Sequence, residues 1–220
     1  MASQSAPAHM QGTHGPPELG DTERAIYEAA RDILAEGGLA ELSMRALAAR
    51  VGTTPTAIYH YFQSKEDLIH QVVMRGFQEF DAGLRRSIAG LPFGSTDRLA
   101  AIGEAYIRFA VENQQYFKIT FGIQAGCPRE LDEFPARGGY DLLRQCVVDA
   151  MEAGTIRDDD PDRVVLYLWS IVHGLVTIFL ACECDSMLDA TEIEVPAGAS
   201  PQGHLFQQFR IFIEEGLVPA

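Results

Sequence analysis

The sequence has little of what marks secreted proteins and most enzymes. Four cysteines in 220 residues are too few for a disulfide scaffold, and we expect them to be thiols in a reducing compartment. The N-terminus lacks the positive region and the apolar run of a signal peptide, so we expect a cytoplasmic protein. A P-loop, a Rossmann fingerprint, a nucleophile elbow and paired carboxylates are missing. We therefore predict that the chain is not an enzyme and uses no cofactor.

Metal-ligand patterns are also sparse. One residue separates Cys182 from Cys184, a spacing that a metal or redox site can use, but no second Cys/His pair stands nearby. Cysteines near the end of an apolar helix are commonly buried thiols. We favour that interpretation and predict no metal site.

Acidic residues are missing from one stretch, although the chain holds 31 of them and has a net charge of −14. No Asp or Glu occurs from Leu42 to Lys65, which contains Arg45, Arg50 and His60. A surface that lies against phosphates must avoid carboxylates. The net charge alone argues against nucleic acid, but its distribution matters more. We expect modest nonspecific affinity that depends on a small basic face.

The carboxylate-free stretch also predicts a helix-turn-helix. Ser43 is a good N-cap, and Gly52 supplies the positive φ of a sharp helix exit. Thr54 can cap the next helix, and Pro55 suits its first turn. The second helix of such a motif can enter a major groove. The alternative is a structural helical hairpin that lacks acids by chance.

Hydrophobic periodicity predicts an all-α protein with about nine helices and no strand. We predict a disordered arm at 1–20, a three-helix helix-turn-helix DNA-binding domain at 21–68, and a ligand-binding and dimerisation bundle at 69–220. The expected helices outside the helix-turn-helix begin and end near 21–36, 65–89, 96–113, 116–122, 138–153, 161–182 and 205–216, with a capping box at Ser64 and Asp67 and an acidic loop at 185–203.

The most apolar stretch runs uncharged for 19 residues from Val164 to Cys182, near the lower bound for a membrane span. It lacks a clear basic flank and paired aromatic belts, and Ser170, His173 and Thr177 form a polar stripe on it. We therefore predict no membrane association. A helix that is apolar nearly all round is otherwise buried in a core and a subunit interface.

These residues resemble the TetR family of bacterial transcriptional regulators. About 48 residues, 21–68, keep the order and spacing of its N-terminal domain. The matching pieces are Arg24, Ile26, Ala29, Ala30, Ile33, Leu34, Gly37-Gly38-Leu39, Ser43-Met44-Arg45, Leu47-Ala48, Val51-Gly52, Tyr59-His60-Tyr61-Phe62, Ser64-Lys65-Glu66 and Leu68. More weakly, the Ala110–Phe121 stretch and Trp169-Ser170-Ile171-Val172-His173-Gly174 resemble the W-x-x-V-H-G subgroup's regulatory domain. Relatives often carry Asn-Pro where this chain has Asn113-Gln114.

The predicted DNA-binding face combines that resemblance with side-chain chemistry. The resemblance implies that Ser43, Arg45, Tyr59, His60 and Lys65 face the DNA. Arginine pairs bidentately with guanine, so we expect Arg45 to read a base. The remaining candidates, on the leading edge of the second helix, are Thr54, Pro55 and Thr56. Core packing is the alternative for Tyr59 and Tyr61, and we favour it for Tyr61.

The predicted effector site gathers aromatic residues from several helices, with His173 as a polar anchor. The candidates are Phe77, Phe80, Tyr106, Phe109, Phe117, Phe121, Trp169 and His173. Core packing, or an interface position for His173, is the alternative. The resemblance also implies a four-helix dimer interface, for which the candidates are Ile171, Leu175, Ile178, Phe206, Phe209, Phe212 and Ile213.

The sequence therefore predicts a homodimeric, sequence-specific DNA-binding transcriptional regulator. We expect a repressor that a small apolar or aromatic molecule releases from a palindromic double-stranded DNA operator. The alternatives are a helical protein that does not bind DNA and a small-molecule enzyme with an all-α fold.

Overall fold

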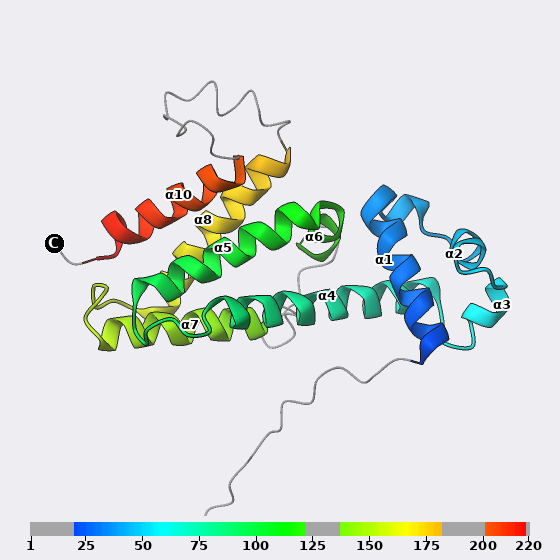
Figure 1. The fold of residues 1–220 in the computed structure, drawn as a ribbon, viewed down its shortest axis with the longest axis horizontal. Coiled ribbons are helices and arrows are strands. Elements are labelled where there is room, and N and C mark those ends of the chain that lie inside the picture. Colours follow the sequence, from blue (N-terminus) through cyan, green and yellow to red (C-terminus); the bar gives the residue numbers. More distant parts are fainter. Residues whose placement is uncertain (1–19, 122–136, 182–200, 219–220) are drawn as a thin grey trace, which may run out of the picture.

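The computed structural model describes residues 20–121, 137–181 and 201–218. These ranges form nine α-helices and no strand, which confirms the predicted all-α fold (Figure 1). The helices are α1 (Asp21–Glu41), α2 (Met44–Val51), α3 (Pro55–Ile58), α4 (Lys65–Ser87), α5 (Thr96–Glu112), α6 (Gln114–Phe121), α7 (Arg137–Glu152), α8 (Pro161–Ala181) and α10 (Pro201–Gly216).

The first helix is interrupted at the glycines where the sequence predicts its end. Gly38 leaves helical geometry, with φ 72° and ψ −165°, and a further helical segment follows it, so that α1 spans Asp21–Glu41 across a kink. The glycine allows this break because it reaches a positive φ without the steric cost of a Cβ.

The turn between α2 and α3 has the predicted caps. The Ser43 hydroxyl accepts from the Ala46 N–H at 3.1 Å, and the Thr54 hydroxyl accepts from the Ala57 N–H at 3.2 Å. Gly52 ends α2 in the left-handed region at φ 75°, and its N–H donates to the Ala48 carbonyl. These local bonds fix how α3 leaves α2, and so set which side chains the motif presents.

The long helix α4 begins at the predicted capping residue. The Ser64 hydroxyl accepts from the Asp67 N–H at 3.0 Å. The reciprocal bond differs from the usual capping box, since Asp67 accepts from the Gln63 N–H at 2.8 Å, one residue before the cap. From this start α4 runs along the lower side of the molecule and joins its two halves (Figure 1).

The chain has two hydrophobic cores. One is built from α1 to α3 and the first turns of α4, with Ile26, Leu47 and Phe62 fully buried in it. The other fills the bundle of α4, α5, α7, α8 and α10. Tyr116 of α6 lies in the first core, whereas its neighbour Phe117 lies in the second. The short helix α6 therefore contributes adjacent residues to both cores.

The apolar helix α8 is buried on one face only. Val165, Leu168 and Val176 pack into the bundle, while Leu166 and Ile178 remain 61% and 49% exposed. By length and composition α8 is the one helix among the described residues that could cross a membrane. It packs against α5, α7 and α10 like a core helix, and the described residues leave part of its apolar surface exposed.

Some sequence predictions lie outside the described residues. They include all but the last residue of the N-terminal arm, Cys127, the Cys182–Cys184 pair and most of the acidic loop at 185–203, whose predicted end falls inside α10. Cys146 is a buried free thiol, as expected, and burial raises its pKa.

Candidate DNA-binding face and effector cavity

The structure brings the eight predicted DNA-binding residues to one end of the molecule. Six of them are exposed, and Pro55 and Lys65 are half-buried. Arg45 projects from the first turn of α2 with no ion pair among the described residues. Tyr59, 51% exposed, and His60 follow directly after α3. Hydroxyl, imidazole, guanidinium and ammonium groups thus share a surface that can donate to phosphates and bases.

One cation of the carboxylate-free stretch is already paired. The Arg50 guanidinium makes two hydrogen bonds to Glu36 of α1, at 2.7 and 2.5 Å. The pairing lowers the pKa of Glu36. The sequence analysis counted Arg50 with the basic face, but this fork joins α1 to α2 instead. Arg45, His60 and Lys65 remain as the basic groups of the face.

The expectation that Tyr61 packs in the core is wrong. Helix α3 ends at Ile58, and a turn follows in which the Tyr61 N–H donates to the Ile58 carbonyl at 2.9 Å. Because this turn leaves helical periodicity, Tyr61 is 44% exposed and Phe62 fills the core in its place.

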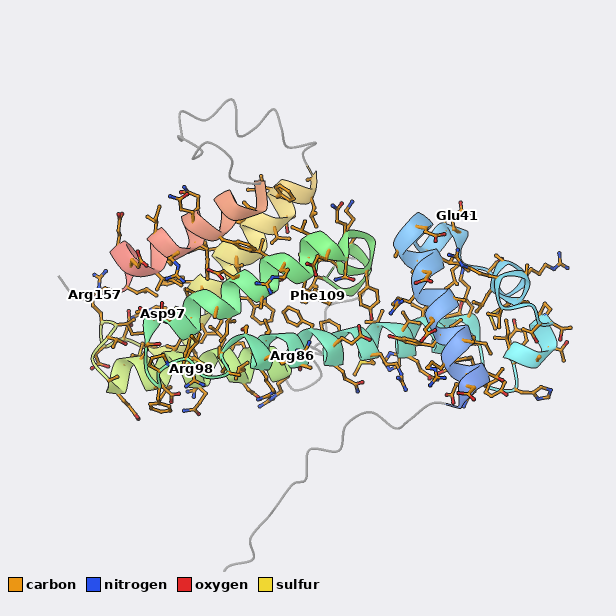
Figure 2. All side chains as sticks on the ribbon, in the orientation of Figure 1. Glu41, Arg86, Asp97, Arg98, Phe109 and Arg157 are labelled. Atoms are coloured by element: carbon orange, nitrogen blue, oxygen red, sulfur yellow. The ribbon has the colours of Figure 1, made fainter. Side chains whose placement is uncertain are left out.

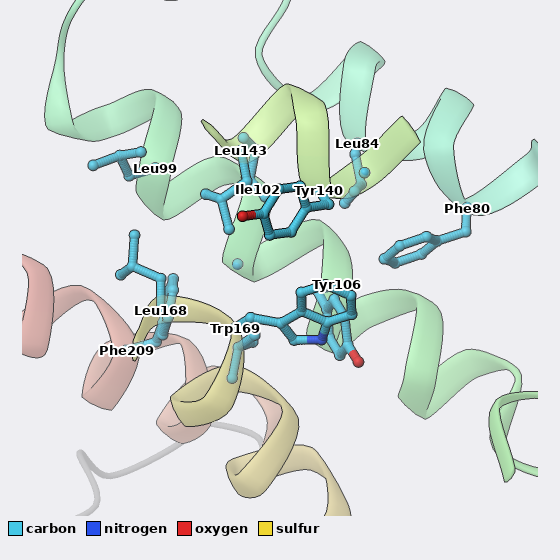
Figure 3. A pocket seen from close by; sticks show the side chains of 13 residues that line it. Phe80, Leu84, Leu99, Ile102, Tyr106, Tyr140, Leu143, Leu168, Trp169 and Phe209 are labelled. Atoms are coloured by element: carbon cyan, nitrogen blue, oxygen red, sulfur yellow. The ribbon is translucent and has the colours of Figure 1, made fainter. Parts of the chain in front are cut away.

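Within the bundle, thirteen residues from α4, α5, α7, α8 and α10 line a cavity of about 30 Å³ (Figure 3). That space holds roughly one water molecule. The lining contains no Lys, Arg, Asp, Glu or His. The aromatic side chains that line it are Phe80, Tyr106, Tyr140, Trp169 and Phe209.

Of the eight predicted effector residues, Phe80, Tyr106 and Trp169 line this cavity. The other five lie beyond it, in a cluster of rings that includes Phe80 and Tyr106. Its ring centroids are 4.8 to 6.3 Å apart: Phe77–Phe121, Phe80–Phe109, Phe80–Tyr106, Phe117–Phe121 and Tyr106–His173. The structure therefore gathers seven of the eight predicted effector residues, all but Trp169, into one aromatic cluster. Only three of the eight line the cavity.

The predicted polar anchor is engaged within the chain. The Tyr106 hydroxyl and Nδ1 of His173 are 2.7 Å apart, which joins α5 to α8. Burial lowers the pKa of His173, so the imidazole is neutral at pH 7 and Nδ1 can accept the hydroxyl proton. Burial also raises the pKa of Tyr106, which keeps the hydroxyl protonated as a donor.

The sequence analysis missed Tyr140 and Gly139 of α7 and Leu168 of α8 as lining residues. Tyr140 stands 6.1 Å from Trp169, centroid to centroid, and its hydroxyl donates to Asp162 at 2.8 Å. Helical periodicity marked α7 as amphipathic. It gave no sign that the first turn of α7, with its two glycines, meets α4.

That first turn rests on Asp81 of α4. A Cβ at Gly138 would stand 2.1 Å from Oδ2 of Asp81, and one at Gly139 would stand 3.1 Å from Oδ1. A side chain at Gly138 would displace the Asp81 carboxylate, and one at Gly139 would crowd it. Burial raises the pKa of Asp81 to about 6, although Arg85 and the Gly139 N–H act in the opposite direction. Asp81 Oδ1 is buried and accepts no hydrogen bond from the described residues.

A second groove, of about 390 Å³, opens between α4 and α5 beside Phe109 and Arg86 (Figure 2). Its rim carries both signs of charge, with Glu79 and Glu112 as well as Arg86 and Arg108. No residue of the predicted effector site except Phe109 lines it. We assign it no ligand.

The predicted dimer residues divide into two groups. Phe209 and Ile213 are only 2% and 1% exposed, since α10 packs on α5 and the Phe209 ring covers Gly103. Both side chains are buried in the core of their own chain, so we no longer expect them to contact a partner. The half-buried or exposed candidates are Ile171, Leu175, Ile178, Phe206 and Phe212.

These features define a class of protein: an all-α chain with an N-terminal helix-turn-helix and a helical bundle around an apolar cavity. Family comparisons agree. Residues 26–72 match the family model described as "Bacterial regulatory proteins, tetR family", and residues 99–193 match "Tetracyclin repressor-like, C-terminal domain". The two matches lie in order along the chain, the first over the helix-turn-helix and the second over much of the bundle.

Among curated proteins, the chain is 34% identical over 76 residues to the HTH-type transcriptional regulator UidR of Escherichia coli. The match covers 34% of this chain and 39% of UidR. An uncharacterised HTH-type regulator of Bacillus subtilis, YobS, is 24% identical over 102 residues, which is 46% of this chain and 52% of YobS. The chain therefore spans about half or less of the length of these relatives.

Solved structures share the fold over nearly the whole chain. A Rhodococcus sp. RHA1 protein of unknown function has a TM-score of 0.72 at 23% identity, covering 96% of this chain and 100% of the other. A putative regulator from Saccharomonospora viridis, solved with choline, has 0.72 at 18%, covering 90% and 98%. AibR, solved with isovaleryl coenzyme A and operator DNA, has 0.63 at 20%, covering 87% and 97%.

Proposed function

We propose that this chain is a homodimeric, cytoplasmic repressor that binds a palindromic DNA operator and leaves it when a small, largely apolar molecule enters the bundle. The DNA-binding domain is residues 21–68, and the effector and dimerisation domain is residues 69–220. The match of the C-terminal half to a regulator family supports this reading over an enzyme.

The observation that carries the proposal is the exposed face at the helix-turn-helix. Arg45, Tyr59 and His60 lie exposed in a stretch without carboxylates, in a chain of net charge −14. Such a concentration of donors on α2 and in the turn after α3, beside the helix that can enter a major groove, is what DNA recognition needs. The 34% identity to UidR over 76 residues supports the same role.

A route from the cavity to this face runs through α6. Phe117 stacks near Tyr106 and His173, with ring centroids 5.8 Å apart in both cases. One residue earlier, Tyr116 is buried in the N-terminal core and donates to the Val72 carbonyl of α4. A ligand that displaces Phe117 would therefore displace Tyr116, and with it the packing of α1 and α4.

The dimer converts a shift within each protomer into a change in the spacing of the two recognition helices. Two recognition helices must meet successive major grooves, about 34–36 Å apart, to bind a palindrome. A shift of α4 in each protomer changes that spacing. We assign to the partner protomer the apolar side of α8 that carries the exposed Ile178 and, beside it, the half-buried Ile171 and Leu175.

Two fold neighbours support a ligand-responsive regulator. AibR was solved with an acyl coenzyme A and operator DNA, and the S. viridis protein was solved with choline. The W-x-x-V-H-G motif at Trp169–Gly174 supports assignment to that subgroup, because Trp169 lines the cavity and His173 bonds Tyr106.

The test is selection of bound duplexes from a random library, followed by titration of the selected duplex in rising salt. We expect a palindromic consensus, two chains per duplex and a steep decline of affinity with salt. Recovery of no consensus by a folded dimeric protein would overturn the proposal.

A further inference from the structure

The effector cavity is lined by aromatic and aliphatic side chains. Tyr106, Tyr140 and Trp169 lie together, with Phe80 and Leu84 on one side of them and Leu99, Leu168 and Phe209 on the other (Figure 3). Two pairs of these rings are close, with Phe80–Tyr106 centroids at 5.3 Å and Tyr140–Trp169 centroids at 6.1 Å. Tyrosine and tryptophan faces carry negative electrostatic potential and attract cations.

The charge around the cavity argues against an anionic ligand. Among the described residues, no Lys, Arg or His lines it. His173, which bonds Tyr106 just beyond the wall, is held neutral because burial lowers its pKa. A carboxylate or phosphate placed there would lose its hydration without gaining a partner, which is costly.

A negative group stands beside the aromatic residues instead. A Cβ at Gly139, itself a lining residue, would lie 3.1 Å from Asp81 Oδ1, 3.0 Å from Leu84 Cδ1 and 3.3 Å from Phe80 Cε1. Asp81 does not itself line the cavity, but its Oδ1 lies next to the lining residue Gly139, just behind the cavity wall. Arg85 and the Gly139 N–H interact with the Asp81 carboxylate, but its buried Oδ1 atom accepts no hydrogen bond from the described residues. A buried, unpartnered carboxylate oxygen at a binding site calls for a cation or donor.

We propose that the cavity takes an organic ammonium ion with an apolar body. The ammonium group lies against the faces of Tyr106, Tyr140 and Trp169, with Asp81 as its counter-ion. The body extends beside Leu168. The proposal rests on the function proposed above, for which it names the class of effector.

Binding requires the cavity to open, since about 30 Å³ does not admit an ammonium head group. The wall nearest Asp81 is the first turn of α7, whose Gly138 and Gly139 lie against α4. An ammonium ion that enters beside Asp81 forms an ion pair with its carboxylate and moves the first turn of α7 away from α4. The ligand thus acts on the helix that joins the bundle to the DNA-binding domain.

The experiment compares ligands of matched shape. Choline and hexyltrimethylammonium are titrated against 3,3-dimethylbutan-1-ol, the uncharged carbon counterpart of choline, and against octanoate. The chain has a single tryptophan, Trp169, so its emission reports on this cavity alone. We expect saturable changes for both ammonium ions, with affinity at least about tenfold above the alcohol. Octanoate should give none.

Two variants locate the cation. Asp81→Asn should weaken hexyltrimethylammonium binding at least about tenfold and leave the alcohol unchanged. Asp141→Asn is the matched control, because it removes a nearby exposed carboxylate on α7 and should leave both unchanged. Calorimetry with Trp169→Leu should show a similar tenfold loss, and circular dichroism establishes that each variant is folded.

Equal affinity for choline and the alcohol, or tighter binding of octanoate, would overturn the assignment. So would equal losses in the Asp81 and Asp141 variants, which would indicate attraction to the overall negative charge. Operator binding is measured separately without ligand. If the folded protein binds no operator, the proposed regulatory function is refuted. The ligand titration still decides independently whether the cavity takes an ammonium ion.

Discussion

The Tyr116 hydroxyl donates a hydrogen bond to the main-chain carbonyl of Val72, forty-four residues earlier in the chain. Tyr116 is 3% exposed, and Gly76 makes room for its ring, since a Cβ there would overlap three ring and hydroxyl atoms. The bond ties α6 to α4 at the point where α4 leaves the N-terminal core. The two helices must therefore move together or lose this contact.

Removing that hydroxyl should loosen the junction. We expect Tyr116→Phe to lower the free energy of unfolding by about 1 kcal/mol, the usual net worth of one hydrogen bond, because the ring itself stays buried. Chemical denaturation measures it. Tyr61→Phe, which removes an exposed hydroxyl, should have no effect, and equal losses in the two variants would contradict the assigned contact.

Arg45→Ala should cost about 1–3 kcal/mol of specific operator binding if Arg45 reads a base. Discrimination should relax at one base pair of each half-site. Fluorescence anisotropy with the selected duplex and its single-base variants measures both effects. Arg24→Ala is the control, as Arg24 is paired with Asp21 on α1. An unchanged affinity for Arg45→Ala would refute the role.

Lys65→Ala should weaken binding to all duplexes alike, because an ammonium group at the start of α4 neutralises phosphate without reading sequence. The slope of log affinity against log salt should become shallower by about one. Titration of specific and nonspecific duplexes over a range of salt tests this. A loss confined to the operator would assign Lys65 to base recognition instead.

Ile178→Glu should separate the proposed dimer. Ile178 lies 49% exposed on the apolar side of α8, and two-fold symmetry would bury both new carboxylates. We expect the dissociation constant of the dimer to rise at least about a hundredfold. Sedimentation equilibrium measures this dissociation constant. Phe93→Glu, a change at an apolar residue 71% exposed before α5, should leave assembly intact.

Asp81 should make stability depend on pH with an unusual sign. Its pKa is raised to about 6 in the fold from 3.8, so its ionised form destabilises the folded state. The contribution of protonated Asp81 to the free energy of unfolding is fully present below about pH 4 and is lost as pH rises through 6. Its charged neighbours are Arg85 and Asp141. Asp81→Asn should stabilise the protein by about 1 kcal/mol at pH 7.5, after allowance for partial exposure.

That difference should shrink toward pH 4, where wild-type Asp81 is protonated. Melting temperatures of wild type and Asp81→Asn from pH 4 to 8 give the comparison. A difference that stays constant across this range would show that the substitution acts through packing and not through charge.

Local chemistry explains what the sequence predicted well. The caps at Ser43, Thr54 and Ser64 and the turn at Gly52 involve residues three to five positions apart, so their roles can be read from the chain alone. Helical periodicity likewise gave the ends of α5 and α7 nearly to the residue.

What the sequence could not give depends on contacts between distant segments. The fork between Arg50 and Glu36, the approach of Gly139 to Asp81 and the Tyr116 bond join different helices. Periodicity marks a residue as inward-facing but not which core it enters. Aromatic residues were therefore assigned together to the effector site, although few of them reach the cavity.

The split position of α6 bears on how this chain can be engineered. A chimaera that joins this DNA-reading half to a foreign sensor after residue 68 would leave the tyrosine-sized space beside Val72 and Gly76 unfilled. Such a hybrid would have a cavity in its N-terminal core. Grafts should therefore carry α6 along with α1 to α4, or transplant a tyrosine at the matching position of the donor.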